Sequence, residues 1–138
     1  MHRRQFQPKA NIPMGTETYE RLALQLHTSC TTLIERPSPD SFNQLSKMFA
    51  ALCNVGMAGE AVDLATGTMS DICDRYEQQL VVTVNECEAE WLRLAVASID
   101  DRLHQVPVNR LAKAVSEVEM FCAFVGAQAQ PHETQQET

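Results

Sequence analysis

Apolar residues recur every three or four positions along five stretches of this chain, the spacing that places them on one face of an α-helix. Polar residues fill the positions between them, so each stretch has one apolar and one solvated face. The five apolar stripes consist of Tyr19, Leu22, Leu26, Cys30, Leu33 and Ile34; Phe42, Leu45, Met48, Phe49, Leu52 and Cys53; Ala61, Leu64, Ala65, Thr68, Ile72 and Tyr76; Trp91, Leu92, Ala95, Val96, Ile99 and Leu103; and Leu111, Ala114, Val115, Val118, Phe121, Cys122 and Val125. The pattern predicts an all-α fold, a compact bundle of about five helices, either orthogonal or up-and-down.

Capping residues indicate where these helices begin and end. Ser38 can cap the helix that starts at Pro39, and Gly56 stands where a C-terminal cap belongs. Asn85 and Glu88 have the spacing of a capping box. The expected helices therefore run from Thr16 to the Arg36-Pro37-Ser38-Pro39 break, from Pro39 to Gly56, over residues 58–78, from Asn85 to about His104, and from Pro107 to Gly126.

Residues 80–84 differ from the rest of the chain because they form a short β-branched run, Leu80-Val81-Val82-Thr83-Val84. The run is too short for a helix of its own. Two interpretations remain: a buried extended linker, or one short strand that has no obvious partner in this chain.

The two ends of the chain carry no helical pattern. Residues 1–15 contain Pro8, Pro13 and Gly15 and have a charge of +3, which predicts a flexible basic arm. Residues 127–138 are rich in Gln, Glu and Thr and are expected to be a disordered tail. A single helical domain over residues 16–126 lies between them.

Charge is unevenly distributed along the chain, whose formal net charge is −7. Residues 57–101 contain ten acids and two arginines, which gives this segment −8. Such an acidic segment argues against direct binding of nucleic acid, because binding would bring like charges together. It suits a partner protein with a basic surface. The alternative is a solvated acidic face that only keeps the protein soluble.

The basic arm is the one segment that favours the opposite kind of partner. Arg3, Arg4, Phe6 and Lys9 could contact nucleic acid or an acidic groove. Three positive charges supply only a weak phosphate attraction, so a solvated terminus is the expected state.

The five cysteines, at positions 30, 53, 73, 87 and 122, are odd in number and include no C-x-x-C pair. This predicts reduced thiols in a reducing compartment. No apolar region follows the basic start and no stretch approaches 18 apolar residues, so neither a secretory signal nor a membrane helix is expected. The prediction is a cytoplasmic protein without membrane contact.

Three local patterns could carry chemistry, and each is incomplete. His27 and Cys30 share a helical face and could supply half of a zinc site, or a nucleophile and its base, but no second ligand pair or third group accompanies them. Asp101 and His104 match only one arm of a di-iron pattern. Gly56-Met57-Ala58-Gly59-Glu60 lacks the Gly-Lys-Ser/Thr of a phosphate loop. We expect no cofactor, no metal and no catalytic residue.

The start of the fourth predicted helix gathers acids around the single tryptophan. Glu86, Glu88 and Glu90 surround Trp91, and acids at a helix N-terminus favour the helix dipole. A tryptophan beside acids is also typical of an interface anchor, although the core is the more usual place for a lone tryptophan. The residues predicted to bind a partner are Asp71, Asp74, Glu86, Glu90 and Trp91.

Four segments of the chain resemble small helical proteins of unknown function that are encoded in proteobacterial phages and prophages. The segments are Arg3-Arg4-Gln5-Phe6, Pro39-Asp40-Ser41-Phe42-Asn43-Gln44-Leu45, Asp71-Ile72-Cys73-Asp74-Arg75-Tyr76-Glu77 and Pro107-Val108-Asn109-Arg110-Leu111. None of them is a functional motif, so the resemblance assigns no site residue. It implies a setting in which accessory proteins act stoichiometrically on host proteins, including components of defence systems.

Together these features predict a non-enzymatic helical protein that binds another protein through an acidic surface, as a phage-encoded modulator or inhibitor of host machinery. The alternative from a different class is a structural or assembly protein that works through self-association. An enzyme that uses His27 and Cys30 is the third possibility. Acids that lie off the apolar stripes should point outward, namely Glu60, Asp63, Asp71, Asp74, Glu86 and Glu90.

Overall fold

The computed structural model describes the backbone of residues 10–137 and the side chains of residues 10–123 and 125. These residues form five α-helices and no strand, which confirms the all-α prediction. The helices are α1 (Thr16–Glu35), α2 (Pro39–Asn54), α3 (Glu60–Gln79), α4 (Glu86–Leu103) and α5 (Val108–Glu137). The bounds differ from the expected ones by a few residues, except at the end of α5.

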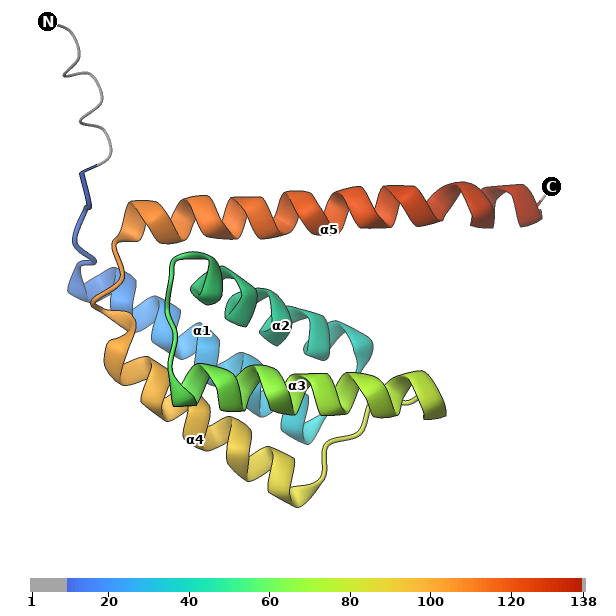
Figure 1. The fold of residues 1–138 in the computed structure, drawn as a ribbon, viewed down its shortest axis with the longest axis horizontal. Helices are drawn as coiled ribbons and strands as arrows, with labels where there is room; N and C mark the ends of the chain where they lie inside the picture. Colours follow the sequence, from blue (N-terminus) through green and yellow to red (C-terminus); the bar gives the residue numbers. More distant parts are fainter. Residues whose placement is uncertain (1–9, 138) are drawn as a thin grey trace, which may run out of the picture.

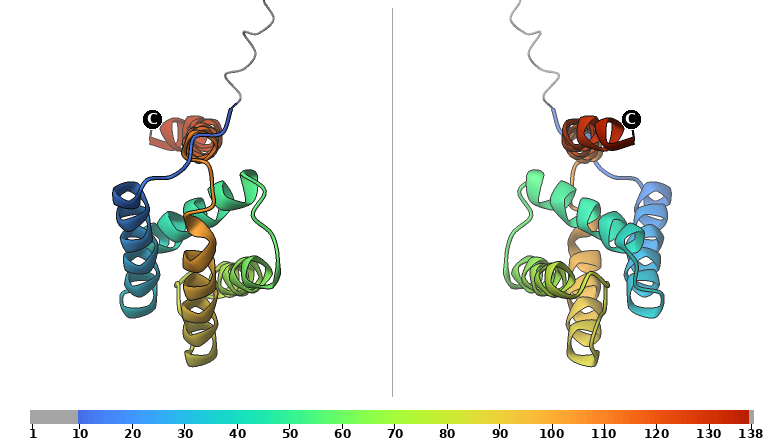
Figure 2. Two further views of the ribbon diagram at one scale, coloured as in Figure 1. Left: turned by 90° about the vertical axis from the view of Figure 1, so that its left-hand side faces the viewer. Right: turned by 90° about the vertical axis from the view of Figure 1, so that its right-hand side faces the viewer.

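Helix α2 lies at the centre of the arrangement, in contact with α1, α3 and α5 (Figure 1). Helices α3 and α4 pack against each other, and α1 also packs against α4. Helix α5 contacts α2 alone among the described helices and runs past its end. Seen along α5, the α3–α4 pair lies on the side of the bundle away from α5 (Figure 2).

The core is made of the stripes that the sequence predicts. The most deeply buried large side chains are Leu26, Leu33, Leu45, Ile72, Leu92, Val96 and Ile99. Removing such a side chain down to alanine costs on the order of 2–5 kcal/mol, because a cavity adds to the lost transfer energy. Several stripe positions stay outside this core, and Cys53, Trp91, Val115, Phe121 and Val125 are exposed.

Local capping explains why the helices begin and end where they do. Ser38 accepts a hydrogen bond from Ser41 N at 3.0 Å and completes a capping box at the start of α2. At the end of α2, Met57 N donates to Leu52 O and Gly56 N donates to Cys53 O, which is the Schellman arrangement. Gly56 has a φ of +93°, a conformation that a Cβ would strain.

The N-terminal arm is partly fixed. Residues 10–15 were expected to be flexible, but this part runs along the start of α5: Val108 N donates to Ile12 O, Ile12 N to Asn109 Oδ1 and Asn109 Nδ2 to Ala10 O. The side-chain amide of Asn109 thus supplies hydrogen-bond partners to backbone groups of Ile12 and Ala10, which lie in an extended segment without a neighbouring strand. Arg3, Arg4, Phe6 and Lys9 lie outside the described residues.

The structure also shows the form of the short β-branched run and the position where the last helix ends. Residues 80–85 form a connection without strand structure, so the linker interpretation is correct and the strand interpretation is wrong. The burial expected for the whole run is not found, because only Val82 is buried. The last helix does not end at Gly126, because α5 continues to Glu137. A glycine is a permissive signal that does not oblige a helix to end. The expected disorder of residues 127–138 stays a prediction.

Within the described residues, no helix combines the length and the apolar character that a membrane crossing requires.

Candidate functional site

A partly buried ion pair joins α3 to α4 at the end that carries their connection. Arg75 of α3 contacts Glu88 of α4 through both terminal nitrogens, at 3.1 and 2.5 Å. Its Nε and Nη2 also donate to the hydroxyl and the carbonyl of Thr83. Glu88 is 3% exposed and its carboxylate accepts from Asn85 N in a capping box, so one carboxylate caps α4 and pairs with α3. The hydrogen bond to Glu88 raises the pKa of Arg75.

Exposed apolar side chains lie at this end of the α3–α4 pair. Leu80 follows α3 in the left-handed conformation, with φ of +63°, and is 75% exposed. Val81 is exposed as well, and so is Trp91, one turn after Glu88 on α4. A non-glycine residue at positive φ costs roughly 1–2 kcal/mol, and strain of this kind gathers at functional positions.

The structure divides the five predicted partner-binding residues between two faces. Asp71 lies one turn before Arg75 on α3 and is close enough to raise the pKa of that guanidinium, after the larger contribution of Glu88. Trp91 follows Glu88 by three positions and therefore shares the α3 side of α4. These two residues border the same α3–α4 seam.

The other predicted residues lie apart from the seam. Glu86 and Glu90 stand one turn apart on α4, and Glu90 is rotated by about 100° from Trp91. Asp74 is exposed on α3, one position before Arg75. All six acids expected to point outward are exposed, namely Glu60, Asp63, Asp71, Asp74, Glu86 and Glu90.

The core interpretation of Trp91 is wrong. Trp91 opens the apolar stripe of α4 in the sequence, yet 41% of its surface is exposed. Leu92, the next residue, is completely buried and fills the position that the core requires. A stripe identifies the apolar side of a helix, but its edge positions are buried only if a neighbouring helix reaches them.

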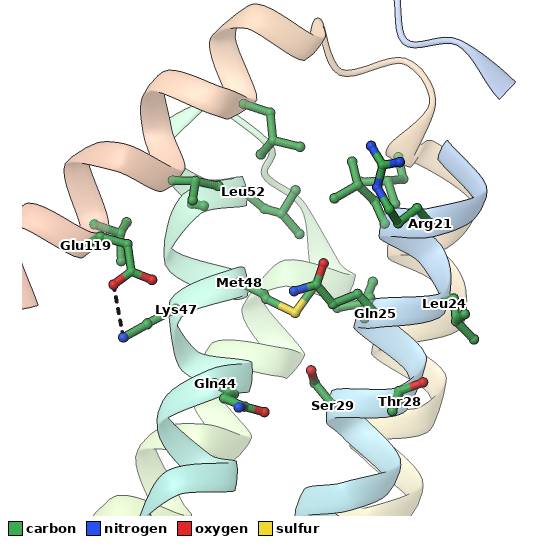
Figure 3. Close-up of a pocket in the computed structure, with 17 residues that line it drawn as sticks. Arg21, Leu24, Gln25, Thr28, Ser29, Gln44, Lys47, Met48, Leu52 and Glu119 are labelled. Atoms are coloured by element: carbon green, nitrogen blue, oxygen red, sulfur yellow. Dashed lines mark hydrogen bonds and ion pairs between the residues drawn. The ribbon is translucent and has the colours of Figure 1, made fainter. Parts of the chain in front are cut away.

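An apolar groove lies between α1, α2 and α5 and was not predicted from the sequence (Figure 3). It has a volume of about 850 Å³ and is open to solvent. Met48 and Leu52 of α2 line it, together with Val115 and Val118 of α5. Gln25 of α1 and Met48 point toward each other across it (Figure 3).

Charged side chains lie at the edges of this groove. Lys47 and Glu119 form an ion pair at 3.2 Å that bridges α2 and α5 (Figure 3). Arg21 of α1 lines the groove and forms no ion pair with any of the described residues. The groove is thus mainly apolar, with polar side chains from α1 and α2 in its lining (Gln25, Thr28, Ser29 and Gln44) and with two cations and one carboxylate at its edges.

A polar cluster between α1 and α4 was also missed. Asp100 of α4 accepts a hydrogen bond from Tyr19 Oη, and its other oxygen lies 2.8 Å from His27 Nε2. The ring of His104 meets that of Tyr19 edge-on, with centroids 5.8 Å apart. The hydrogen bond from Tyr19, followed by the one from His27, lowers the pKa of Asp100. The same bond raises the pKa of Tyr19.

The sequence offered only a weak signal for this cluster. Tyr19 is the one hydroxyl-bearing aromatic residue in the first apolar stripe, and a partly buried tyrosine hydroxyl usually finds a partner. Which carboxylate supplies that partner depends on how α1 packs against α4.

His27 and Cys30 are not brought together as a reactive pair. His27 faces Asp100, whereas Cys30 is 3% exposed within the core. Burial raises the pKa of the Cys30 thiol to about 11, so the thiolate is scarce at neutral pH. Among the described residues, no group of three or more His, Cys, Asp or Glu side chains could hold a metal ion.

The remaining two sequence patterns, Asp101 with His104 and the glycine-containing residues 56–60, lie at helix ends. His104 caps the C-terminal end of α4, beside the exposed Asp101. Residues 56–59 belong to the turn between α2 and α3, and Gly59 occupies the cap position before Glu60, the first residue of α3, at a φ of +122°.

No family model, no curated protein and no solved structure matches this chain. The resemblance to phage-encoded helical proteins therefore stays a prediction.

Proposed function

We propose that this chain is a non-enzymatic protein-binding domain whose α3–α4 end docks onto a basic surface of a partner protein. The observation that carries the proposal is that exposed apolar side chains at this end, Leu80, Val81 and Trp91, occur on the same pair of helices as the exposed acids. Interfaces combine a few apolar anchors with a polar rim.

Hydrogen bonds fix the connection that carries the exposed apolar side chains Leu80 and Val81. The Arg75–Glu88 pair and the bonds from Arg75 to Thr83 tie the α3–α4 connection to both helices. A connection fixed in this way loses little conformational entropy when a partner binds, which favours affinity. The strained Leu80 then presents its side chain to solvent at the tip of α3.

The acids set the chemistry of the partner. Asp71 borders the α3–α4 seam, and Asp74 of α3 and Glu86 and Glu90 of α4 are exposed elsewhere on the same two helices. Opposite charges across an interface mainly accelerate association and discriminate against wrong partners. The partner surface is therefore basic, with an apolar centre that receives Trp91. A component of host machinery, such as a defence protein, fits this role if the chain is encoded by a phage.

To test the proposal, the chain is immobilised and used to capture partner proteins from an extract of the native host. The variant Asp71→Lys, Asp74→Lys, Glu86→Lys and Glu90→Lys should weaken the captured complex at least tenfold, and Trp91→Ala should weaken it at unchanged charge. A matched control reverses four acids elsewhere, all exposed on α1 and α2: Glu17, Glu20, Glu35 and Asp40. Both reversals change the net charge from −7 to +1, because each replacement adds two charges.

The proposal requires that position matters more than net charge. The control variant should keep its binding, and added salt should slow association of the unaltered chain more than it speeds dissociation. Equal loss in both reversed variants would mean that only net charge counts. Unchanged binding after reversal at the α3–α4 end would leave these acids as a solvated face.

A further inference from the structure

The groove between α1, α2 and α5 contains a buried hydroxyl that has no hydrogen-bond partner among the described residues. Ser29 of α1 lines the groove, is 8% exposed and points into it (Figure 3). Thr68 of α3 is buried as well, but its hydroxyl donates to Leu64 O at 2.7 Å, a bond of a kind that Ser29 lacks. A buried hydroxyl without a partner costs free energy, so a polar group that enters the groove gains by meeting Ser29.

A second polar group with no described partner lies farther along the same groove (Figure 3). Arg21 lines the groove from α1 and forms no ion pair with a described residue. It precedes Ser29 by eight positions, which corresponds to about 12 Å along the axis of α1. Lys47 is already paired with Glu119, so it offers no open charge to a ligand. The groove therefore presents a positive charge near one end and a hydroxyl near the other.

Apolar side chains line the groove between these two groups, and the apolar surface continues onto its edges. Met48 and Leu52 line it from α2. Leu24 of α1 and Val115 of α5 also line it and are 68% and 44% exposed. A small molecule inside the groove leaves these edge residues in water, whereas a helix about 10 Å in diameter covers them. The open side of the groove thus favours a helix as the occupant.

We propose that the groove binds an amphipathic helix of a partner protein, which places an acidic residue at Arg21 and a hydrogen-bonding side chain, such as that of asparagine, at Ser29. Residues seven or eight positions apart share one face of a helix, so a helix that runs along the groove reaches both groups at once. Apolar residues between them, at intervals of three and four, meet Met48 and Leu52. The carboxylate pairs with the guanidinium of Arg21, and the polar outer face of the partner helix stays in water.

This surface is separate from the α3–α4 end. Among the described residues that line the groove, none belongs to α3, and α4 supplies Leu103 alone, from its last turn. Either surface is therefore able to bind while the other is empty. The inference goes beyond the proposed function and does not depend on it.

Two synthetic helical peptides of about 16 residues test the proposal. Each carries three leucines on one face, with a glutamate and an asparagine seven positions apart on that face, and the two peptides have these residues in opposite order, so that both directions of the bound helix are covered. Fluorescence anisotropy, with the full chain at up to about 1 mM, should show saturable binding of at least one peptide. Leu24→Glu should raise the dissociation constant at least tenfold. Leu94→Glu on α4, at a residue exposed to a similar extent, 58%, is the matched control and should leave it unchanged.

Double-mutant cycles test the two polar contacts separately. Arg21→Gln should weaken binding of the glutamate peptide about tenfold, but should not weaken binding of a peptide that has glutamine instead. Ser29→Ala should weaken binding of the asparagine peptide about threefold, but not of a peptide that has alanine instead. Arg93→Gln, at an exposed arginine of α4, is the matched control for the loss of one positive charge and should affect neither peptide.

Circular dichroism must show equal helix content in all variants, and Val115→Glu replaces Leu24→Glu if that variant fails to fold. Absence of saturable binding for both peptides overturns the proposal. Binding that survives Leu24→Glu, or that falls equally with Arg21→Gln and Arg93→Gln, overturns it as well, because the contact then lies elsewhere or depends on net charge alone. Tighter binding of dodecanoate than of either peptide assigns the groove to a small amphiphile, and a dimer in sedimentation equilibrium that Leu24→Glu dissociates assigns it to a second copy; both results overturn the proposal.

Discussion

At the scale of single residues, polar side chains between helices carry energy that the apolar stripes do not reveal. Asp100 shows this, since one carboxylate serves Tyr19 and His27 of α1 at once. Hydrogen bonds to a charged group are stronger than those between neutral groups, although partial exposure of Asp100 to solvent reduces the gain. The cluster thus contributes to the contact between α1 and α4.

Asp100→Asn should lower the free energy of unfolding by about 1 kcal/mol at neutral pH, measured by urea denaturation. The pKa of Asp100 is lower in the folded chain than in the unfolded chain, so its stabilising effect is present above the unfolded value of about 3.9 and is lost as the pH falls through the folded value. The difference between the two proteins should therefore narrow below about pH 4. Asp101→Asn, at the exposed neighbour, is the control and should have little effect; an equal loss there would rule out a specific role for Asp100.

The sequence predicted the exposure of the six acids but not the burial of Glu88. A residue off the stripe normally points to solvent, and the six acids follow that rule. Glu88 is buried because Arg75 of α3 reaches it and Asn85 shares its capping box. The capping box was readable from local spacing, whereas the ion pair depends on the register between two helices.

At the scale of elements, two turns place residues in left-handed conformations, and only one of them uses glycine. Gly56 ends α2 at φ +93°, and Leu80 ends α3 at φ +63°. Leu80 gains no burial in return, since it is 75% exposed. A strained position without a packing benefit is consistent with a binding role for its side chain.

Leu80→Gly should stabilise the chain by about 0.5–1 kcal/mol, because glycine relieves the strain at a smaller entropic cost, and should weaken partner binding if the side chain is an anchor. Gly56→Ala should have the opposite effect on stability, a loss of about 1–2 kcal/mol, because alanine acquires the strain that glycine avoids. Urea denaturation compares both with the unaltered chain. A loss of stability in Leu80→Gly would contradict the account of strain.

At the scale of the whole molecule, the charges are segregated by the fold. Helices α3 and α4 carry most of the acids, whereas Arg21, Lys47, Arg110 and Lys113 lie on α1, α2 and α5. Acids that lie close together on adjacent helices repel one another in the compact state. Salt screens this repulsion over distances of about 10 Å at 0.1 M.

Raising sodium chloride from about 10 mM to about 150 mM should therefore raise the melting temperature by a few degrees, as followed by circular dichroism. The variant with Asp71, Asp74, Glu86 and Glu90 changed to lysine should lose most of this response, because the four changes add eight charges and leave the segment of residues 57–101, with −8 in the unaltered chain, without net charge. An equal response in both proteins would mean that repulsion among these acids does not limit stability.

The sequence by itself determined the class of the fold, the five helices and most of the core. Helical spacing and capping depend on residues within a turn or two of one another, so they can be read without knowing the fold. Leu26, Leu45, Ile72, Leu92 and Ile99 were assigned to the interior in this way, and all five are buried. The Schellman motif at Gly56 and the capping box at Asn85 are equally local.

Only the tertiary structure decided which parts of the stripes are covered and which polar groups meet. A stripe gives the direction of an apolar face but not the length of the neighbour that packs on it, so the exposure of Phe121 was not foreseeable and the sequence left two interpretations of Trp91 open. The groove and the Asp100 cluster join residues from different helices, and their geometry follows from the packing of α1 against α2 and α4. The surfaces to which we assign function arise where that packing leaves an apolar face uncovered.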